Sequence, residues 1–483
     1  MSPTTHLPEN GLSEEAIQQR LRELTTDDMN WKEGKFFGYV YYPGDAYYAV
    51  IKKAYMDFSA TNALNPAVFP SLKQMENDVV RIAANLLHGD EQVSGTMTSG
   101  GTESIFMAVK AAKEWAKKHK RSRNPLMLLP VTAHPAFCKA ADTIELNYKQ
   151  IKVDANFQVD LEDLKKNITA DTVLIVGSAP SYPQGMIDPI EEMAKIAKSH
   201  HCLMHVDACV GGFILPFLKM NSVDIPPFDF SVDGVTSMSA DLHKYGYAAK
   251  GASVVLYKNP DLRKGQFYVK TDWSGGIYGS PSFMGTRGGG PIAAAWTALN
   301  HIGMDGYLRM AKETYEETVY IKRTIREEIP ELKILGQPIA TLFAITSDTL
   351  DMYEVADELG ELGWTINRQQ LPSSLHIVLN YIHVGKGESF IRDLKTAVQK
   401  AKRFSLQHLK NNLQIGAVKG LKKILNEQQF TNLTQRFSGS SNPEGKRKAA
   451  MYGMMSELSG SGSLNDMVVD FLDKLYKHED KKA

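Results

Sequence analysis

The stretch GVTSMSADLHKYGYAAKGASVVLYK, residues 234–258, determines how the rest of the chain is interpreted. Its two ends, GVTSMS and ASVVLYK, are typical of short buried strands. Between them SADLHKYGYAAKG carries an imidazole, His243, and two lysines, Lys244 and Lys250. Burying an ammonium group is costly unless the group is paired or used chemically. The stretch therefore predicts a functional site at the end of a strand.

Outward from this stretch, apolar runs alternate with helical patterns from about residue 59 to 330. Strands are predicted at LMLLPV, KQIKVD, TVLIVGSAP, CLMHVDACV, GVTSMS and SVVLYK, and an amphipathic helix at ESIFMAVKAAKEWAKKH. This alternation indicates an α/β domain with a largely parallel sheet. Residues 1–58 are predicted to form an N-terminal arm, with a helix capped by Ser13, and residues 331–483 a small C-terminal α+β domain.

The bulk composition excludes several classes of partner. Lys+Arg and Asp+Glu both number 55, so no basic field favours nucleic acid or an anionic membrane. The three cysteines form no CxxC pair, which favours a reducing compartment and gives no zinc site. No apolar run approaches the roughly 20 residues of a membrane helix. We expect a soluble, cytoplasmic protein without a metal.

Several further candidates follow predicted strands, and each has a structural alternative. The turn TMTSGGTES opens a helix at Thr102 and offers backbone N–H groups to a phosphate, although such a turn is as often a tight connection. Asp207 ends the strand of HVDACV, where it could bind a ligand or cap the next helix. His134 follows LMLLPV and could be structural. In the aromatic stretch FFGYVYY, Tyr39 or Tyr41 could line a site or only pack.

Together these residues match the needs of an aldehyde cofactor that bears a pyridine ring and a phosphate. In this order the chain resembles the pyridoxal-phosphate enzymes of the group II decarboxylase class, fold type I, and within them the sphingosine-1-phosphate lyases. The matching segments are TSGGTES, HVDACVGGF, VTSMSADLHKYGYAAKGASVVLYK and TDWSGGIYGSP. The resemblance implies a large domain around a mostly parallel seven-stranded sheet, a small C-terminal α+β domain, and a homodimer with shared active sites.

The resemblance also implies the cofactor, pyridoxal 5'-phosphate, and its binding residues. Lys244 would form the Schiff base, Asp207 would pair with the ring nitrogen, and His134 would stack on the ring.

The cofactor phosphate would be held by Gly101, Thr102 and His243. The implied reaction is a retro-aldol cleavage of sphingosine 1-phosphate between C2 and C3, which gives a long-chain aldehyde and phosphoethanolamine. Lys244 or Tyr41 would serve as acid or base.

Five residues are implied in substrate binding: Asn62, Asn65, Lys250, Tyr278 and Tyr452. Lys250 would grip the substrate phosphate, where the alternative is a surface lysine, and Tyr278 would come from the partner subunit. Asn65 stands where the family carries a histidine, and an amide cannot carry the positive charge that strengthens phosphate binding. We therefore predict weaker binding of a phosphorylated substrate, or a different substrate.

Two further departures from the family pattern are Gly288, which stands where a proline is usual, and an insertion near 404–442. Two other functions remain open. An amino-acid decarboxylase of the same class would use the same Lys244, Asp207 and His134. A degenerate homologue would bind a lipid or a partner without catalysis.

Overall fold

The computed structural model describes residues 7–120, 122, 124–402, 448–449, 452–453, 455 and 462–476. The chain forms two compact units. The larger unit comprises Phe37–Thr349 and Leu375–Lys395, and the smaller comprises Met1–Phe36, Leu350–Ser374 and Thr396–Ala483. The insertion predicted near 404–442 lies outside the described residues.

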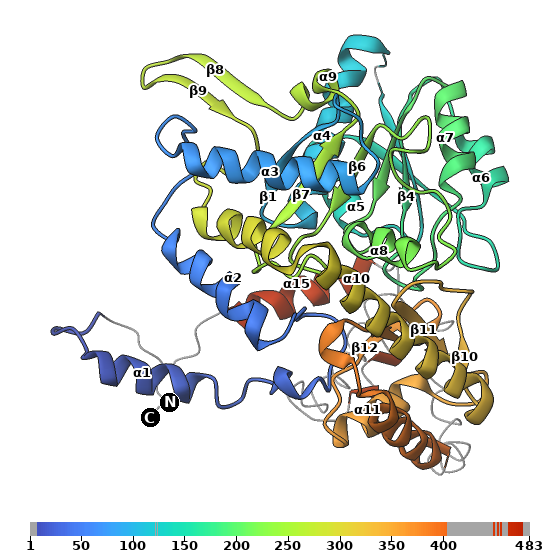
Figure 1. Ribbon diagram of the computed structural model, residues 1–483. Helices are drawn as coiled ribbons and strands as arrows, with labels where there is room; N and C mark the ends of the chain where they lie inside the picture. Colours follow the sequence, from blue (N-terminus) through green and yellow to red (C-terminus); the bar gives the residue numbers. More distant parts are fainter. Residues whose placement is uncertain are drawn as a thin grey trace. The chain divides into compact units, whose positions relative to one another are not determined.

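The larger unit is built on a seven-stranded sheet in the order β1–β7–β6–β5–β4–β2–β3 (Figure 1). Its strands are β1 (Ser94–Thr98), β2 (Leu126–Pro130), β3 (Asn147–Ile151), β4 (Thr172–Ser178), β5 (Leu203–Asp207), β6 (Ser237–Ala240) and β7 (Ser253–Tyr257). Strands β2 to β6 run parallel to their neighbours, whereas β7 is antiparallel to β6 and β1. The prediction of a mostly parallel seven-stranded sheet is confirmed, and each predicted run overlaps a strand.

Within the main sheet, strand β1 is the one that the sequence pattern did not predict. Its sequence, SGTMT, places Ser94, Thr96 and Thr98 on one face of the sheet, because side chains alternate along a strand. The Thr98 hydroxyl lies 2.6 Å from that of Ser104 on the helix that follows, and the Thr96 hydroxyl accepts a hydrogen bond from the Gln266 amide at 2.9 Å. Both buried threonines therefore have polar partners, and the strand needs no continuous apolar run.

Helices cover both faces of this sheet. The alternation is visible at β2, where Leu128 belongs to one hydrophobic core and Met127 and Leu129 to the other. The first core includes α3 (Pro70–Leu86), α7 (Ile190–Ser199), α8 (Leu215–Met220) and α10 (Gly289–Glu328), and the second includes α4 (Gly101–His119) and α5 (Ala136–Thr143). Figure 1 shows α3 and α10 side by side, and α10 is interrupted at Gly303 (φ 63°).

The remaining elements of the larger unit are short. They are α2 (Asp45–Asp57), α6 (Leu161–Asn167), α9 (Pro260–Lys264), and the 3-10 helices η2 (Gly211–Phe213) and η3 (Tyr381–His383). Strands β8 (Tyr268–Trp273) and β9 (Gly276–Ser280) form a hairpin that projects from the main sheet (Figure 1). Strand β11 (Leu342–Thr346) pairs antiparallel with β10 (Lys333–Ile334) and β13 (Ser373–Val378).

The smaller unit contains α1 (Glu14–Leu24), η1 (Trp31–Glu33), α11 (Met352–Glu361), β12 (Asn367–Gln370) and α15 (Gly462–Tyr476). The predicted Ser13 cap is confirmed, because its hydroxyl accepts the N–H of Ala16 at 3.3 Å. In the interior of this unit the buried Asp357 accepts hydrogen bonds from Arg368 at 2.6 Å and from the N–H of Lys448 at 2.9 Å. None of the helices described in either unit has the length and apolar character needed to span a bilayer.

Candidate active site

Three parallel strands end level with one another at one edge of the main sheet. Ser178 of β4 pairs with Asp207 of β5, and Asp207 pairs with Ser239 of β6. Strand β1 ends at the same edge, since its last residue, Thr98, pairs with Ser253, the first residue of antiparallel β7. The loops that follow these strands therefore converge, and ligands of open α/β sheets bind at such an edge.

Lys244 lies in the turn after β6 and contacts a carboxylate. Its Nζ is 2.9 Å from Oδ2 of Asp241, and Asp241 is almost fully buried. Burial is the largest influence and lowers the pKa of Lys244, but the charge of Asp241, with smaller effects of Cys209 and Asp207, raises it, and the net pKa lies above the ordinary lysine value. Lys244 is thus an ammonium ion paired with Asp241.

Asp207 is buried at the end of β5 and is held by its own loop. Its Oδ1 accepts the N–H of Cys209 at 3.0 Å and the hydroxyl of Ser239 at 3.4 Å. No described donor reaches Oδ2, so this oxygen remains for a ligand. Ser239 also lies 3.2 Å from Nε2 of the buried His205, and burial lowers the pKa of His205 to about 4. The imidazole is therefore neutral and supports the strand rather than the chemistry.

The glycine-rich turn between β1 and α4 is a cradle for an anion. No described residue accepts a hydrogen bond from the N–H of Gly101 or Thr102, so both N–H groups remain available at the helix N-terminus. A Cβ atom on Gly101 would lie 2.8 Å from Cys209 Sγ and 2.9 Å from Asp241 Oδ2, and one on Gly100 would lie 3.3 Å from the His243 ring. A side chain at position 101 would therefore displace Cys209 or Asp241.

The carboxylate of Glu103 fixes this turn from within α4. Its Oε2 accepts the N–H of Ser99 at 2.7 Å, and its Oε1 accepts the N–H of Phe283 at 2.9 Å. Two backbone hydrogen bonds to one buried carboxylate are charge-assisted and strong. Glu103 therefore couples the glycine-rich turn to the segment that follows the β8–β9 hairpin.

Tyr41 packs into the turn that carries Lys244. Its ring meets that of Tyr245 edge-on with centroids 5.0 Å apart, and the Tyr245 hydroxyl lies 2.6 Å from Thr341 Oγ1 and donates to the carbonyl oxygen of Leu379 at 2.7 Å. Burial raises the pKa of Tyr41 far above its usual value, so the phenol stays protonated. Tyr39, the other candidate in this stretch, is 59% exposed.

Lys250 lines a cavity of about 260 Å³ next to the turn. The other lining residues are Tyr55, Met97, Thr98, Ser99, Glu103, Gly251, Met284, Arg287, Gly288, Pro291 and Ile292. The Lys250 ammonium donates to the carbonyl oxygen of His243 at 3.2 Å and lies 5.3 Å from the centroid of the Tyr41 ring. Desolvation, together with the charge of Lys244, lowers the pKa of Lys250 to about 8.

The second cation of this cavity, Arg287, is already paired. Its Nη1 lies 2.7 Å from Glu76 Oε1, and its Nη2 donates to the carbonyl oxygen of Ala63 at 3.3 Å. Lys250 forms no ion pair with a carboxylate in the described part of the chain. An incoming anion therefore finds Lys250 as a cation that is not neutralised by an acid.

Asn62 and Asn65 both stabilise their own loop. Asn62 Oδ1 accepts the N–H of Leu64 at 2.9 Å and the N–H of Arg287 at 3.2 Å. Asn65 is exposed, and its Oδ1 accepts the N–H of Ala67 at 2.9 Å. Neither residue lines the cavity of Lys250. A substrate that contacts Asn62 or Asn65, as predicted, would have to extend beyond this cavity.

The other predicted residues have contacts of their own. His134 is exposed in the loop after β2, where its Nδ1 accepts the N–H of Ala136 at 3.2 Å. Tyr278 lies on β9, 6.4 Å between ring centroids from Trp273 of the same hairpin. Tyr452 belongs to the smaller unit, where its ring lies 5.3 Å from the Arg368 guanidinium. These contacts do not test the roles expected of the three residues, which remain predictions.

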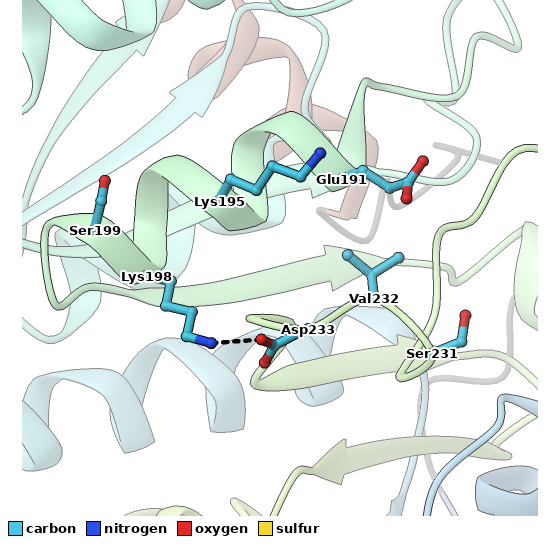
Figure 2. Close-up of a pocket in the computed structure, with 7 residues that line it drawn as sticks. All are labelled: Glu191, Lys195, Lys198, Ser199, Ser231, Val232 and Asp233. Atoms are coloured by element: carbon cyan, nitrogen blue, oxygen red, sulfur yellow. Dashed lines mark hydrogen bonds and ion pairs between the residues drawn. The ribbon is translucent and has the colours of Figure 1, made fainter.

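A second cavity, of about 510 Å³, has none of this chemistry. It is lined by Glu191, Lys195, Lys198, Ser199, Ser231, Val232 and Asp233 (Figure 2). The exposed Lys198 pairs with Asp233, so charges of both signs cancel on this surface. None of the predicted site residues contributes to it.

The sequence analysis missed three residues at the site: Asp241, Glu103 and Tyr182. Asp241 stands three residues before Lys244 in the stretch that opened the analysis, and Glu103 lies in TSGGTES, so both were within the matching segments. Tyr182 follows β4 and its ring centroid lies 4.1 Å from that of the buried His376. Its position at the shared strand edge was the signal that could have identified it.

Comparisons with known proteins agree with this geometry. Residues 3–344 match the family model of the pyridoxal-dependent decarboxylase conserved domain. The chain is 43% identical over 406 residues to the sphingosine-1-phosphate lyase of Oryza sativa subsp. japonica, which covers 82% of this chain and 75% of that protein. It is 35% identical over 476 residues to that of Saccharomyces cerevisiae, covering 98% of this chain and 75% of the relative.

Solved structures give the same result. A sphingosine-1-phosphate lyase of Burkholderia pseudomallei superposes with a TM-score of 0.80 at 37% identity, covering 85% of this chain and 96% of that one. A glutamate decarboxylase of Lactobacillus brevis, with a TM-score of 0.73 at 20% identity, shares the fold over 83% of this chain and 95% of its own.

The described residues fit the pyridoxal 5'-phosphate of these enzymes. The N–H groups of Gly101 and Thr102 await an anion, Oδ2 of Asp207 awaits a donor, and Lys244 supplies the amine. The chain therefore belongs to the pyridoxal-dependent decarboxylase family and, within it, to the sphingosine-1-phosphate lyases.

Proposed function

We propose that this protein is a pyridoxal-phosphate-dependent lyase that cleaves sphingosine 1-phosphate between C2 and C3, giving a long-chain aldehyde and phosphoethanolamine. The identity to lyases of this name supports the reaction. The assignment of a phosphorylated substrate rests on Lys250. This cation has no carboxylate partner among the described residues and lines a cavity beside the turn of Lys244.

The residues around Lys244 would hold the cofactor in a fixed orientation. Gly101, Thr102 and His243 would bind its phosphate, Asp207 would keep the ring nitrogen protonated, and the exposed ring of His134 would stack on its face. When bound, pyridoxal phosphate supplies an aldehyde that bonds to amines and a ring that accepts the electron pair left when a C–C bond breaks. Lys244 supplies the amine that bonds to this aldehyde.

Lys244 and Tyr41 are the candidates for proton transfer. Because burial raises the pKa of Tyr41, its phenol holds its proton at neutral pH, so Tyr41 would act as a hydrogen-bond donor and not as a base. Lys244, once displaced by the substrate amine, is suited to take the proton of the C3 hydroxyl. We propose this division of roles where the sequence left the two residues equivalent.

The substrate phosphate would be bound by Lys250, with Asn62, Asn65 and Tyr452 as further predicted contacts. Because Arg287 is paired with Glu76, Lys250 supplies the positive charge on the cavity wall, and an asparagine at position 65 adds none. We therefore expect weaker phosphate binding than a histidine at position 65 would give.

We further propose that the protein acts as a homodimer in the cytoplasm. The β8–β9 hairpin exposes Tyr268 (54%), Val269 (61%), Trp273 (55%) and Ile277 (80%), an apolar surface that a second subunit would cover. The partner subunit's Tyr278 would then reach the active site. The free cysteines Cys138, Cys202 and Cys209 suit a reducing compartment.

A mass-spectrometric assay of the cofactor-loaded protein with sphingosine 1-phosphate tests the function. We expect equal amounts of long-chain aldehyde and phosphoethanolamine, and no product with Lys244→Ala. An amino-acid decarboxylase would use the same Lys244, Asp207 and His134, and the lyase identities favour the first reaction. Carbon dioxide release from an amino acid, without cleavage of the phosphosphingoid, would refute the proposal.

A further inference from the structure

The carboxylate of Asp241 has one strong partner and one empty position. Asp241 is 2% exposed and follows β6 directly. Its Oδ2 lies 2.9 Å from Lys244 Nζ and 3.6 Å from His243 Nε2, whereas Oδ1 has no hydrogen-bond partner among the described residues. Burial raises the pKa of Asp241, but the charge of Lys244, with smaller effects of His243 and the Ser253 hydroxyl, lowers it below the ordinary value, so the charged carboxylate depends chiefly on Lys244.

The charge state of Lys244 depends on this contact in turn. Burial alone would lower the pKa of Lys244, because a low dielectric disfavours the ammonium form. The charge and hydrogen bond of Asp241 reverse this effect and, with smaller contributions from Cys209 and Asp207, raise the pKa of Lys244 above that of a free lysine. Asp241 thus favours the protonated form of Lys244.

The titratable groups that face this pair come from every element packed around it. They are Tyr41 from the N-terminal segment, Asp207 and Cys209 after β5, and His243, Tyr245 and Lys250 in the same turn. Burial, more than its neighbours, lowers the pKa of His243, and desolvation lowers that of Lys250. Lys244, at 2.9 Å, is the nearest cation to Asp241, and His243 follows at 3.6 Å.

An ammonium group cannot bond to an aldehyde, because its nitrogen has no free electron pair. Lys244 must first lose its proton; the nitrogen pair then attacks the aldehyde carbon, a carbon–nitrogen double bond forms, and the aldehyde oxygen leaves as water. We propose that Asp241 holds Lys244 in its protonated, unreactive form in the cofactor-free protein, so that capture of the cofactor waits until Lys244 has released its proton to solvent.

The turn of Gly101 lies close to this ion pair. A Cβ atom on Gly101 would lie 2.9 and 3.0 Å from the two oxygens of Asp241. A phosphate bound at the N–H groups of this turn would place a further negative charge near the pair, and such a charge favours the ammonium form of Lys244 as well. Lys244 therefore loses its proton to solvent, and not to Asp241, before the amine reacts.

The rate of cofactor capture as a function of pH tests the proposal. Cofactor-free protein is mixed with pyridoxal 5'-phosphate in a stopped-flow absorbance experiment between pH 6 and 9.5. In the wild type we expect the rate to rise with pH by up to roughly tenfold per unit, as the fraction of neutral amine does. In Asp241→Asn we expect at least a roughly tenfold faster rate at pH 7 and a flatter profile.

A matched control is Asp229→Asn, which removes another buried carboxylate of the same unit, paired with His88 at 2.8 Å. This control should keep the wild-type profile. If Asp241→Asn has the wild-type pH profile, or is slower by one factor at every pH, the proposal is wrong.

A second measurement on the wild type decides the question even if Asp241→Asn does not fold. Cofactor-free protein is labelled with trace acetic anhydride between pH 7 and 11, and labelling of Lys244 and of the exposed Lys52 is read by peptide mass spectrometry. We expect the half-maximal pH of Lys244 to exceed that of Lys52, and a lower value would overturn the proposal. Neither experiment uses a sphingoid substrate, so each outcome is independent of the substrate proposed above.

Discussion

Replacement of Lys250 by glutamine tests the proposed phosphate contact through its pH dependence. The Lys250 ammonium touches the His243 carbonyl oxygen and the Tyr41 ring, and desolvation lowers its pKa to about 8. Lys250 is therefore mostly charged at pH 7 and mostly neutral at pH 9. The phosphate contact is present below pH 8 and is lost as the pH rises through that value.

The expected loss of kcat/KM in Lys250→Gln follows from the type of contact that is removed. A hydrogen bond to a charged group contributes about 1.5–3 kcal/mol. The Lys250 ammonium is partly desolvated at the cavity wall, but the residue as a whole is exposed, so solvent screening reduces the contact to about 1–2 kcal/mol. At pH 7 we expect Lys250→Gln to lower kcat/KM for sphingosine 1-phosphate roughly 5- to 30-fold, and the difference from wild type should shrink above pH 9.

The assay is kcat/KM between pH 6.5 and 9.5, because this parameter reports the pKa values of the free enzyme. Lys258→Gln is the matched control, since Lys258 lies 3.9 Å from Asp90 and does not line the cavity. A loss below about twofold at pH 7, or a constant ratio between Lys250→Gln and wild type at every pH, would refute the reasoning.

Three other substitutions test separate features. Gly101→Ala should weaken cofactor binding at least roughly tenfold in an absorbance titration, because its Cβ would lie 2.8 Å from Cys209 Sγ, whereas Gly279→Ala meets no atom within 4 Å and should bind normally. Asn65→His should lower KM for the phosphorylated substrate several-fold at pH 6.5, where imidazole gains charge; an unchanged KM would contradict this. Burial lowers the pKa of His376 to about 4, so its stabilising effect is present above pH 6.5 and is lost as the pH falls toward 4. His376→Leu should therefore remove about 2 kcal/mol of the stability difference between pH 7 and pH 5, measured by urea unfolding, and an unaltered difference would show that His376 is not the titrating group.

The meeting of Lys244, Asp207 and Gly101 could be predicted because each follows a strand, and the carboxyl ends of parallel strands share an edge. That inference needs only chain order and the fold class. Strand β1 was not predicted because its buried threonines bond to Ser104 and Gln266, partners outside the strand that no local sequence pattern reports.

Asp241 shows a second limit of the sequence. As one of 55 acidic residues it carries no local signal, and its importance rests on a 2.9 Å contact and an oxygen without a donor. The same holds for Arg287, whose charge is visible in the sequence but whose pairing with Glu76 is not. Whether a charged side chain can bind a ligand depends on the residues that surround it in the folded protein.

The hydrogen bonds of Tyr245 bear on where the enzyme begins and ends. Lys244, Asp207 and Gly101 all lie within residues 3–344, the part that matches the family model. Yet the residue next to Lys244 anchors its hydroxyl on the carbonyl oxygen of Leu379, well beyond that boundary. A fragment that stops at residue 344 would keep these three residues but lose the hydrogen bond that supports the turn of Lys244. The family match thus marks the part of the chain that carries these residues. The shortest active fragment must be longer, because it must also include the residues that support them.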